Sequence, residues 1–207
     1  AFAGSNQFAA NVFSRNGVTT TNTNRLLKTT TVFDGYNGTG SVIRSMAVSS
    51  VDATNVNVTY PVTADATQNY FWMLCIRGAK CQVGTFNTAG STSPLTITTT
   101  GITPKLFLPA IVEGGVQHAG TVLQSLLFAI GASDGINNVS CGISDTNGNT
   151  TTEARRYQSS TTLVEYATDG SKKFEGTAAF SGESVILTPT THGGVGWGQG
   201  GYLVIGK

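Results

Sequence analysis

An internal repeat is the feature that most constrains how this chain can fold. The first copy holds Ser-Arg-Asn-Gly at 14–17 and Thr-Thr-Val-Phe-Asp at 30–34. The second copy holds Asp-Thr-Asn-Gly at 145–148 and Thr-Thr-Leu-Val-Glu at 161–165, in the same order and at nearly the same spacing. A recurring unit of this length is one supersecondary module, so it decides the architecture before any single residue does.

The two copies differ in completeness. Each closes on an apolar run, at 70–76 in the first copy and at 202–205 in the second, but the strand-like segments between 83 and 129 have no earlier counterpart. We therefore expect residues 1–80 to form a partial β repeat and residues 81–207 a complete one, with the option that both pack as one sandwich. The missing half of the first copy is expected upstream of Ala1 in a longer precursor, or from a neighbouring subunit as a swapped element.

The local patterns indicate short strands joined by tight turns. Alternating segments at 56–60 and 95–98 predict strands with one wet face. The longer apolar runs at 106–112, 126–130 and 202–205 predict central strands covered on both faces. A short helix is the alternative for 122–130. Tight-turn dipeptides lie between strand-like runs; they are Asn16-Gly17, Asn147-Gly148 and Asp169-Gly170. The predicted fold is all-β, an antiparallel β-sandwich or jelly roll built from the internal repeat.

Composition narrows the range of partners. Only 11% of the 207 residues are charged and the formal net charge is +1, so the surface must be covered mainly by Thr, Ser, Asn and Gly. Nucleic acid is not expected as a partner, because phosphate binding needs clustered basic residues and the 12 lysines and arginines are scattered. No apolar stretch approaches the ~20 residues of a membrane span, so no membrane association is expected.

Three cysteines cannot all pair within one chain. Cys75 and Cys141 each lie in an apolar run that predicts a buried strand, where a thiol acts as a small hydrophobic group. We expect reduced structural cysteines, as in a protein assembled in a reducing cytoplasm.

Four motifs carry a resemblance to a known family. They are Thr-Pro-Lys-Leu-Phe-Leu-Pro at 103–109, Glu-Ala-Arg-Arg-Tyr at 153–157, a strand pair over 176–188 and Gly-Tyr-Leu-Val-Ile-Gly at 201–206. Their order is similar to a recurring β-sandwich module of tailed-bacteriophage virion structural proteins, in which a GF-x-P-K strand, an RRY segment, a hairpin and a closing YLALGG strand follow one another. The chain departs from that pattern in having Ile102-Thr103 before Pro104 and Asn24-Arg25-Leu26 in the first copy.

Catalysis and metal binding have little support in the sequence. There are two histidines, His118 and His192, and neither a Gly-x-Ser-x-Gly nor a His-Glu-x-x-His motif. The acidic residues lie mostly in turn contexts, such as Asp52, Asp65 and Asp169. The nearest metal pairs, His118 with Glu113 and Asp134 with Asp145, have no recognised ligand spacing. We therefore expect no catalytic residues, no metal and no cofactor.

Two segments are candidates for contact with other molecules. Arg155 and Arg156, next to Tyr157, are predicted to form an ion pair with Glu153 or Glu165, or else the three residues contact a neighbouring subunit. The glycine-rich loop over 191–201 places His192, Trp197, Gln199 and Tyr202 close together in sequence, a set that stacks on and hydrogen-bonds to sugars or packs on another subunit.

These patterns predict a non-enzymatic virion structural protein, a capsid or tail component of a tailed phage that assembles with copies of itself and with other virion proteins. The alternative is a receptor-binding or lectin-like fibre domain that binds host-surface glycan. The expected location is the virus particle, assembled in the host cytoplasm.

Overall fold

The protein is described by a computed structural model that covers residues 1–15, 22–36, 41–64, 74–76, 78–112, 125–146, 154–194 and 197–207. Among these residues there are strands and turns but no helix, so the all-β prediction is confirmed. The alternative of a helix at 122–130 is wrong, because residues 125–133 pair on both sides as a central strand. No described segment is a helix that could span a membrane.

The strands are numbered in chain order. Those of residues 1–79 are β1 (Phe2–Ala3), β2 (Asn6–Gln7), β3 (Ala9–Arg15), β4 (Asn22–Lys28), β5 (Phe33–Tyr36), β6 (Val42–Val51) and β7 (Val56–Thr63). Those of residues 80–207 are β8 (Lys80–Asn87), β9 (Leu95–Thr98), β10 (Pro104–Val112), β11 (Ser125–Ser133), β12 (Asn138–Thr146), β13 (Arg155–Ser159), β14 (Leu163–Tyr166), β15 (Lys172–Ser181), β16 (Ser184–His192) and β17 (Gln199–Gly206).

Every strand pair is antiparallel. Residues 80–207 form a six-stranded sheet in the order β13-β12-β11-β10-β17-β8 and a four-stranded sheet in the order β14-β15-β16-β9. Residues 1–79 form the pair β1-β2, the hairpin β3-β4 and the three-stranded sheet β5-β6-β7. The predicted central positions of β10, β11 and β17 in a sheet are confirmed. The expectation that both faces of these strands are covered is wrong for β11, because Ile130 is 48% exposed on its outer face.

The main core lies between the six-stranded and the four-stranded sheet. It contains Phe107 and Val204 from the first sheet and Phe174, Val185 and Leu187 from the second, each at most 1% exposed. Alternation explains the arrangement, because every second side chain of a strand points to the same face. The Asp169-Gly170 turn between β14 and β15 is as predicted, with Gly170 at a φ of +81°; the two Asn-Gly dipeptides lie outside the described residues.

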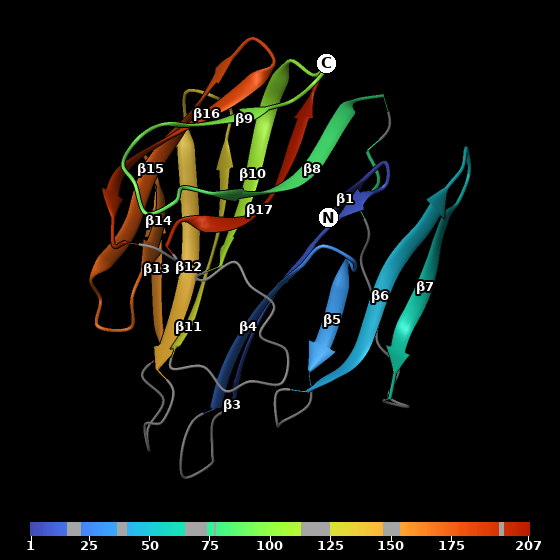
Figure 1. The fold of residues 1–207 in the computed structure, drawn as a ribbon, viewed down its shortest axis with the longest axis horizontal. Helices are drawn as coiled ribbons and strands as arrows, with labels where there is room; N and C mark the ends of the chain where they lie inside the picture. Colours follow the sequence, from blue (N-terminus) through green and yellow to red (C-terminus); the bar gives the residue numbers. More distant parts are fainter. Residues whose placement is uncertain are drawn as a thin grey trace.

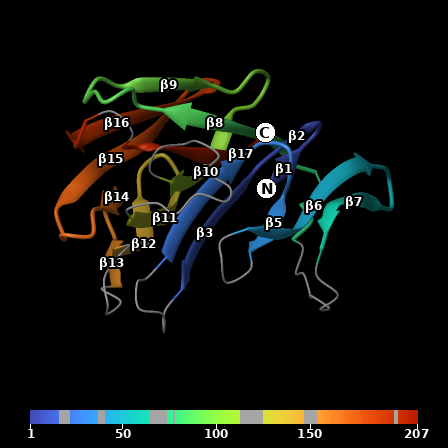
Figure 2. The ribbon, with the colours of Figure 1, turned by 60° about the horizontal axis from the view of Figure 1, so that its bottom comes forward.

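The hairpin β3-β4 lies on the outer face of the six-stranded sheet. A second apolar cluster joins Phe8 and Leu27 to Val83 on β8 and Ala110 on β10. Figure 2 shows the resulting order of layers, from the four-stranded sheet through the six-stranded sheet and the blue β3-β4 hairpin to the β5-β6-β7 sheet. The outer face of the six-stranded sheet is thus covered in part by the chain's own N-terminal half.

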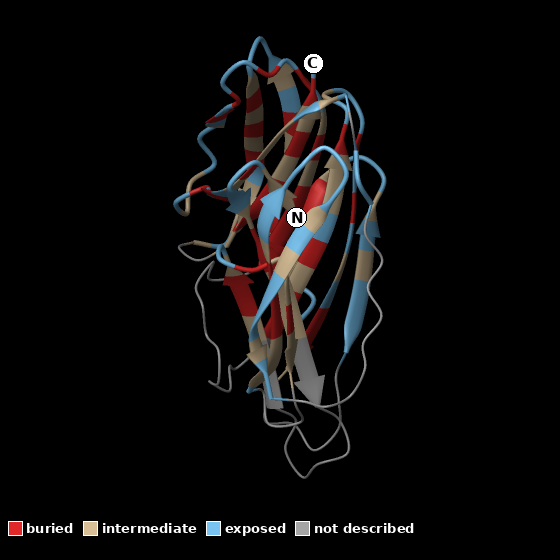
Figure 3. Cartoon of the chain, turned by 90° about the vertical axis from the view of Figure 1, so that its right-hand side faces the viewer, coloured by how far each residue is buried: buried red, intermediate tan, exposed pale blue. Residues whose placement is uncertain are grey.

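The β6-β7 hairpin lies at the margin of the molecule (Figure 1), and Figure 3 views the chain from that side. Within the described residues β7 pairs with β6 alone. Tyr60 is 50% exposed, so the alternation predicted for 56–60 holds at Val56 to Thr59 and ends there.

The prediction of buried cysteines is wrong at both positions. Cys75 and Cys141 are exposed, and Cys75 lies outside any strand. Cys141 is on β12, but the inward positions of that strand are held by residues such as Ser140, whose hydroxyl hydrogen-bonds to the backbone around β14. Cys141 therefore points outward. All three cysteines are free thiols.

Candidate functional site

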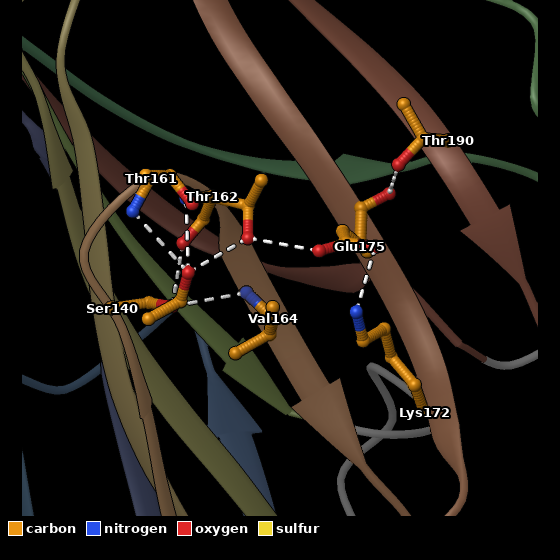
Figure 4. Close-up of polar contacts among 8 residues, drawn as sticks. Ser140, Thr161, Thr162, Val164, Lys172, Glu175 and Thr190 are labelled. Carbon is orange, nitrogen blue, oxygen red and sulfur yellow. Dashed lines mark hydrogen bonds and ion pairs between the residues drawn. The ribbon is translucent and has the colours of Figure 1, made fainter.

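A polar cluster joins the two large sheets where the chain crosses from β13 to β14 (Figure 4). The Ser140 hydroxyl donates to the Thr162 carbonyl at 2.9 Å and accepts from the Val164 amide at 3.0 Å. The Ser159 hydroxyl lies 2.8 Å from that of Thr162 and accepts the Thr162 amide. Strand β12 is therefore fixed to β14 through side chains that satisfy buried backbone groups.

Glu175 extends this cluster onto β15. It accepts a hydrogen bond from the Thr162 hydroxyl at 3.1 Å and forms an ion pair with Lys172 at 2.8 Å. The hydrogen bond from Lys172 lowers the pKa of Glu175, and the same bond raises the pKa of Lys172. The cluster therefore connects β12, β14 and β15 through side-chain hydrogen bonds at the crossover between the two sheets.

The loop after β16 brings His192 and Trp197 together. The Gly194 amide donates to His192 Nδ1 at 3.1 Å, and His192 Nε2 lies 2.6 Å from the Thr88 hydroxyl. Since Nδ1 accepts, we assign the proton to Nε2, which donates to Thr88; the Thr88 hydroxyl in turn reaches the carbonyls of Trp197 and Gly198. Burial lowers the pKa of His192 below its usual value, so the ring is neutral at pH 7.

The remaining residues of the predicted sugar-contact set lie in different surroundings. Trp197 is partly exposed and has the Lys173 ammonium 5.9 Å from its ring centre. Gln199 is partly exposed at the start of β17, opposite Asn87. Tyr202 lies in the main core, where it packs on Phe107 and its hydroxyl accepts a hydrogen bond from Gln82 at 2.8 Å. The structure thus places His192, Trp197 and Lys173 together at the surface. Tyr202 is apart from them, in the core between the two sheets.

The burial of two carboxylates was not predicted from the sequence. Glu165 is fully buried, and its Oε2 accepts the Gly198 amide at 3.3 Å at the base of the same loop. Asp34 is 3% exposed and accepts hydrogen bonds from the hydroxyls of Thr31 and Ser45, and Lys28 lies 3.4 Å away. Both acids lie three residues after a Thr-Thr pair, at 30–31 and 161–162, and this shared pattern is the sequence signal that could have drawn attention to them.

Arg155, Arg156 and Tyr157 point in alternate directions from β13. Tyr157 faces the core, 4.8 Å from the Tyr166 ring, and its hydroxyl donates to the Phe128 carbonyl. Arg155 is exposed and lies beside Gly170, where its charge helps to lower the pKa of Asp169. Arg156 is exposed on the outer face. Neither arginine has an ion pair with Glu165 in the described part of the chain, and Glu153 lies outside it.

Acidic side chains accept hydrogen bonds from turn amides in the described part of the chain, as their sequence contexts predicted. Asp134 Oδ1 accepts the amides of Ile136 and Asn137, and these bonds with the Asn137 side chain lower the pKa of Asp134 to about 2. Asp52 holds its turn in the same way. Asp145, which with Asp134 formed one of the nearest metal pairs by sequence, is buried at the end of β12. His118, Glu113 and Asp65 lie outside the described residues, among which no cluster of three metal-binding side chains occurs.

Two apolar surfaces are the most distinctive features of the exterior. The first is the outer face of β11 and β12, where Ile130, Val139 and Ile143 are 48%, 46% and 44% exposed. The second is a groove of about 610 Å³ between the N-terminal strands, β5-β6 and β8, lined by residues that include Val51, Leu74, Ile76 and Leu203. The sequence pattern Val-x-Cys-x-Ile at 139–143 carries the signal for the first surface, because alternate apolar residues share a face.

Comparisons with protein-family models, with curated proteins and with solved structures find no significant match.

Proposed function

We propose that this chain is a non-enzymatic virion structural protein, a capsid or tail component of a tailed phage, that acts by packing against copies of itself and other virion proteins. The observation that carries the proposal is the exposed apolar surface of the N-terminal half. Leu74 is 85% exposed, and Val51 and Ile76 are 51% and 46% exposed around one groove. Contiguous apolar surface of this kind marks sites that another protein covers.

We further propose that the fold is a β-sandwich built from a complete and a partial repeat. Supporting this, both halves order their strands alike: the hairpin β3-β4 precedes the sheet β5-β6-β7, and the hairpin β12-β13 precedes β14-β15-β16. Asp34 and Glu165 are buried at corresponding positions. In the complete unit, β9 pairs with β16, whereas β7, the counterpart of β16, has no such neighbour among the described residues. The partial unit therefore leaves a strand edge for assembly.

The sequence motifs at 103–109, 153–157 and 201–206 support the phage assignment through their resemblance to tailed-phage virion modules. The test is mass spectrometry of intact, gradient-purified particles from the virus that encodes this chain. We expect its peptides at many copies per particle. Their absence from intact particles, with the protein present in the infected cell, would refute the assignment.

The second candidate is a lectin-like fibre domain that binds host-surface glycan. The observation in its favour is the surface group of His192, Trp197 and Lys173, because an indole beside hydrogen-bonding groups suits a sugar ring. A glycan array would be probed with the protein, with Trp197→Ala and with Tyr60→Ala as a control on another exposed aromatic. Binding lost in the first variant alone supports this function, and an array without signal for the unaltered protein contradicts it.

A further inference from the structure

The outer face of β11 and β12 forms an ordered apolar block. Three cross-strand pairs share this face, and they are Phe128 with Ile143, Ile130 with Cys141, and Ala132 with Val139. We call these six residues the β11-β12 face. Phe128, at one end of it, packs against the cluster of Phe8 and Leu27, and the other five residues lie beyond that contact. Ala129, between two of them on β11, is fully buried in the main core, which fixes the six as the outward set because side chains alternate along a strand. Two adjoining hollows lie along this face and its border with β13.

The same chain already shows how a face of this type is used. Under the proposed repeat, on which this step rests, the match of 14–17 with 145–148 aligns Phe8 with Val139 and Ala10 with Cys141. In the first copy Phe8 is 7% exposed and Ala10 packs beside it, both against the six-stranded sheet. The second copy presents Val139 and Cys141 to solvent, so this apolar face is uncovered beyond the contact at Phe128.

Charges at the two ends of the face decide how a second copy would fit it. Asp134 is exposed in the β11-β12 turn, at one end of the strands. Arg156 pairs in register with Ile143 near the other end and borders the same hollow. A two-fold axis running along the strands would bring Arg156 of one copy to the same end as Arg156 of the other copy, which is unfavourable because both are positively charged. An axis running across the strands reverses their direction and brings each Asp134 towards the partner's Arg156, which is favourable.

We propose that two copies of this protein associate through the β11-β12 face, packed face to face about a two-fold axis that runs across the strands. Ile130, Val139 and Ile143 lose their contact with water, and Asp134 of each copy lies near Arg156 of the other. The middle pair, Ile130 with Cys141, lies close to the axis, so the two Cys141 thiols approach each other. The surface is distinct from the groove of the N-terminal half and gives the proposed assembly one defined contact.

The first experiment measures mass as a function of concentration, by sedimentation equilibrium of the full chain from 1 to about 200 μM. We expect a reversible monomer–dimer equilibrium. Ile143→Asp should raise the dissociation constant at least about tenfold, since it places a charge within the apolar contact. Val51→Asp is the matched control: it makes the same change at a similarly exposed aliphatic residue in the groove. Circular dichroism establishes that each variant is folded.

Two further variants test the orientation. Arg156→Glu should weaken the dimer, because it faces Asp134 of the partner, and the double variant Arg156→Glu with Asp134→Asn should recover part of the loss. The side-chain oxygen of an asparagine at position 134 can still accept the hydrogen bonds that the backbone amides of the turn donate. In a Cys75→Ser, Cys81→Ser background, a short bismaleimide should link two chains through Cys141, and Cys141→Ser should abolish the link.

The outcomes separate cleanly. A monomer throughout the concentration range overturns the proposal, as does a dimer that Ile143→Asp leaves intact. A dimer broken by Val51→Asp alone places the contact at the groove and also overturns it. These experiments test the dimer contact alone. The proposed presence of the protein in virions is tested separately, by mass spectrometry of purified particles.

Discussion

Replacing Phe107 with alanine tests whether the six-stranded and four-stranded sheets share one core. The Phe107 side chain is fully buried. Its ring centre lies 6.4 Å from that of Phe86 in an edge-on arrangement and 6.0 Å from that of Tyr202. It belongs to the cluster that includes Phe174 and Val185 of the opposite sheet, so truncation removes contacts on both sides of the core.

The expected cost follows from the size of the deletion. Large-to-small changes from Phe to Ala in a closed core lower the free energy of unfolding by about 3–5 kcal/mol, because the transfer free energy is lost and a cavity remains. For a chain of this length each kcal/mol corresponds to about 2–4 °C, which gives a fall in melting temperature of about 6–20 °C.

The assay is urea unfolding followed by circular dichroism, with Phe180→Ala as the control. Phe180 packs against the same core but is only partly buried, so its truncation should cost about half as much or less. A loss below about 1 kcal/mol for Phe107→Ala would refute the reasoning, because such a value belongs to a site open to water or free to collapse.

Two other predictions concern the loops. Burial lowers the pKa of His192, so its neutral form stabilises the fold fully above its unfolded pKa of about 6.5, and this contribution is lost as the pH falls from there through the folded pKa. Urea unfolding at pH 8 and pH 5 should show a smaller change in the free energy of unfolding for His192→Gln than for the unaltered protein. An equal change in both proteins would contradict the assigned hydrogen bonds. Gly170→Ala should lower the free energy of unfolding by about 1–2 kcal/mol, since φ is +81° there. The control is Gly35→Ala, where nearby atoms are at ordinary contact distance; both variants are compared by thermal melting, and equal melting temperatures would contradict this account.

Local patterns of the sequence predicted much of the secondary structure. The alternation of Leu95 and Ile97 and the apolar runs at 106–112 and 202–205 became strands β9, β10 and β17. The Asp169-Gly170 dipeptide became a turn. These features depend on neighbouring residues alone, since side-chain direction alternates along a strand and a positive φ favours glycine.

The candidate sites were less predictable. Tyr202 belonged to the predicted sugar-contact set because it follows Trp197 and Gln199 closely in sequence, yet its ring lies in the core and its hydroxyl binds Gln82. Glu165 is fully buried beneath the Gly198 amide, a position that no local pattern indicates. Proximity along the chain does not determine which face of a sheet a side chain joins.

Short-range patterns are enough to predict that this protein is all-β and antiparallel, because its alternating apolar residues, turn dipeptides and low helix propensity act over a few residues at a time. Which of the two faces of each strand is covered depends on the packing of the folded chain. Ala10 on β3 and Cys141 on β12 both lie in antiparallel hairpins, but Ala10 packs against the cluster on the six-stranded sheet and Cys141 faces solvent. That difference depends on which layer packs against each hairpin, and such long-range packing is set by the whole chain and by the molecules that cover it.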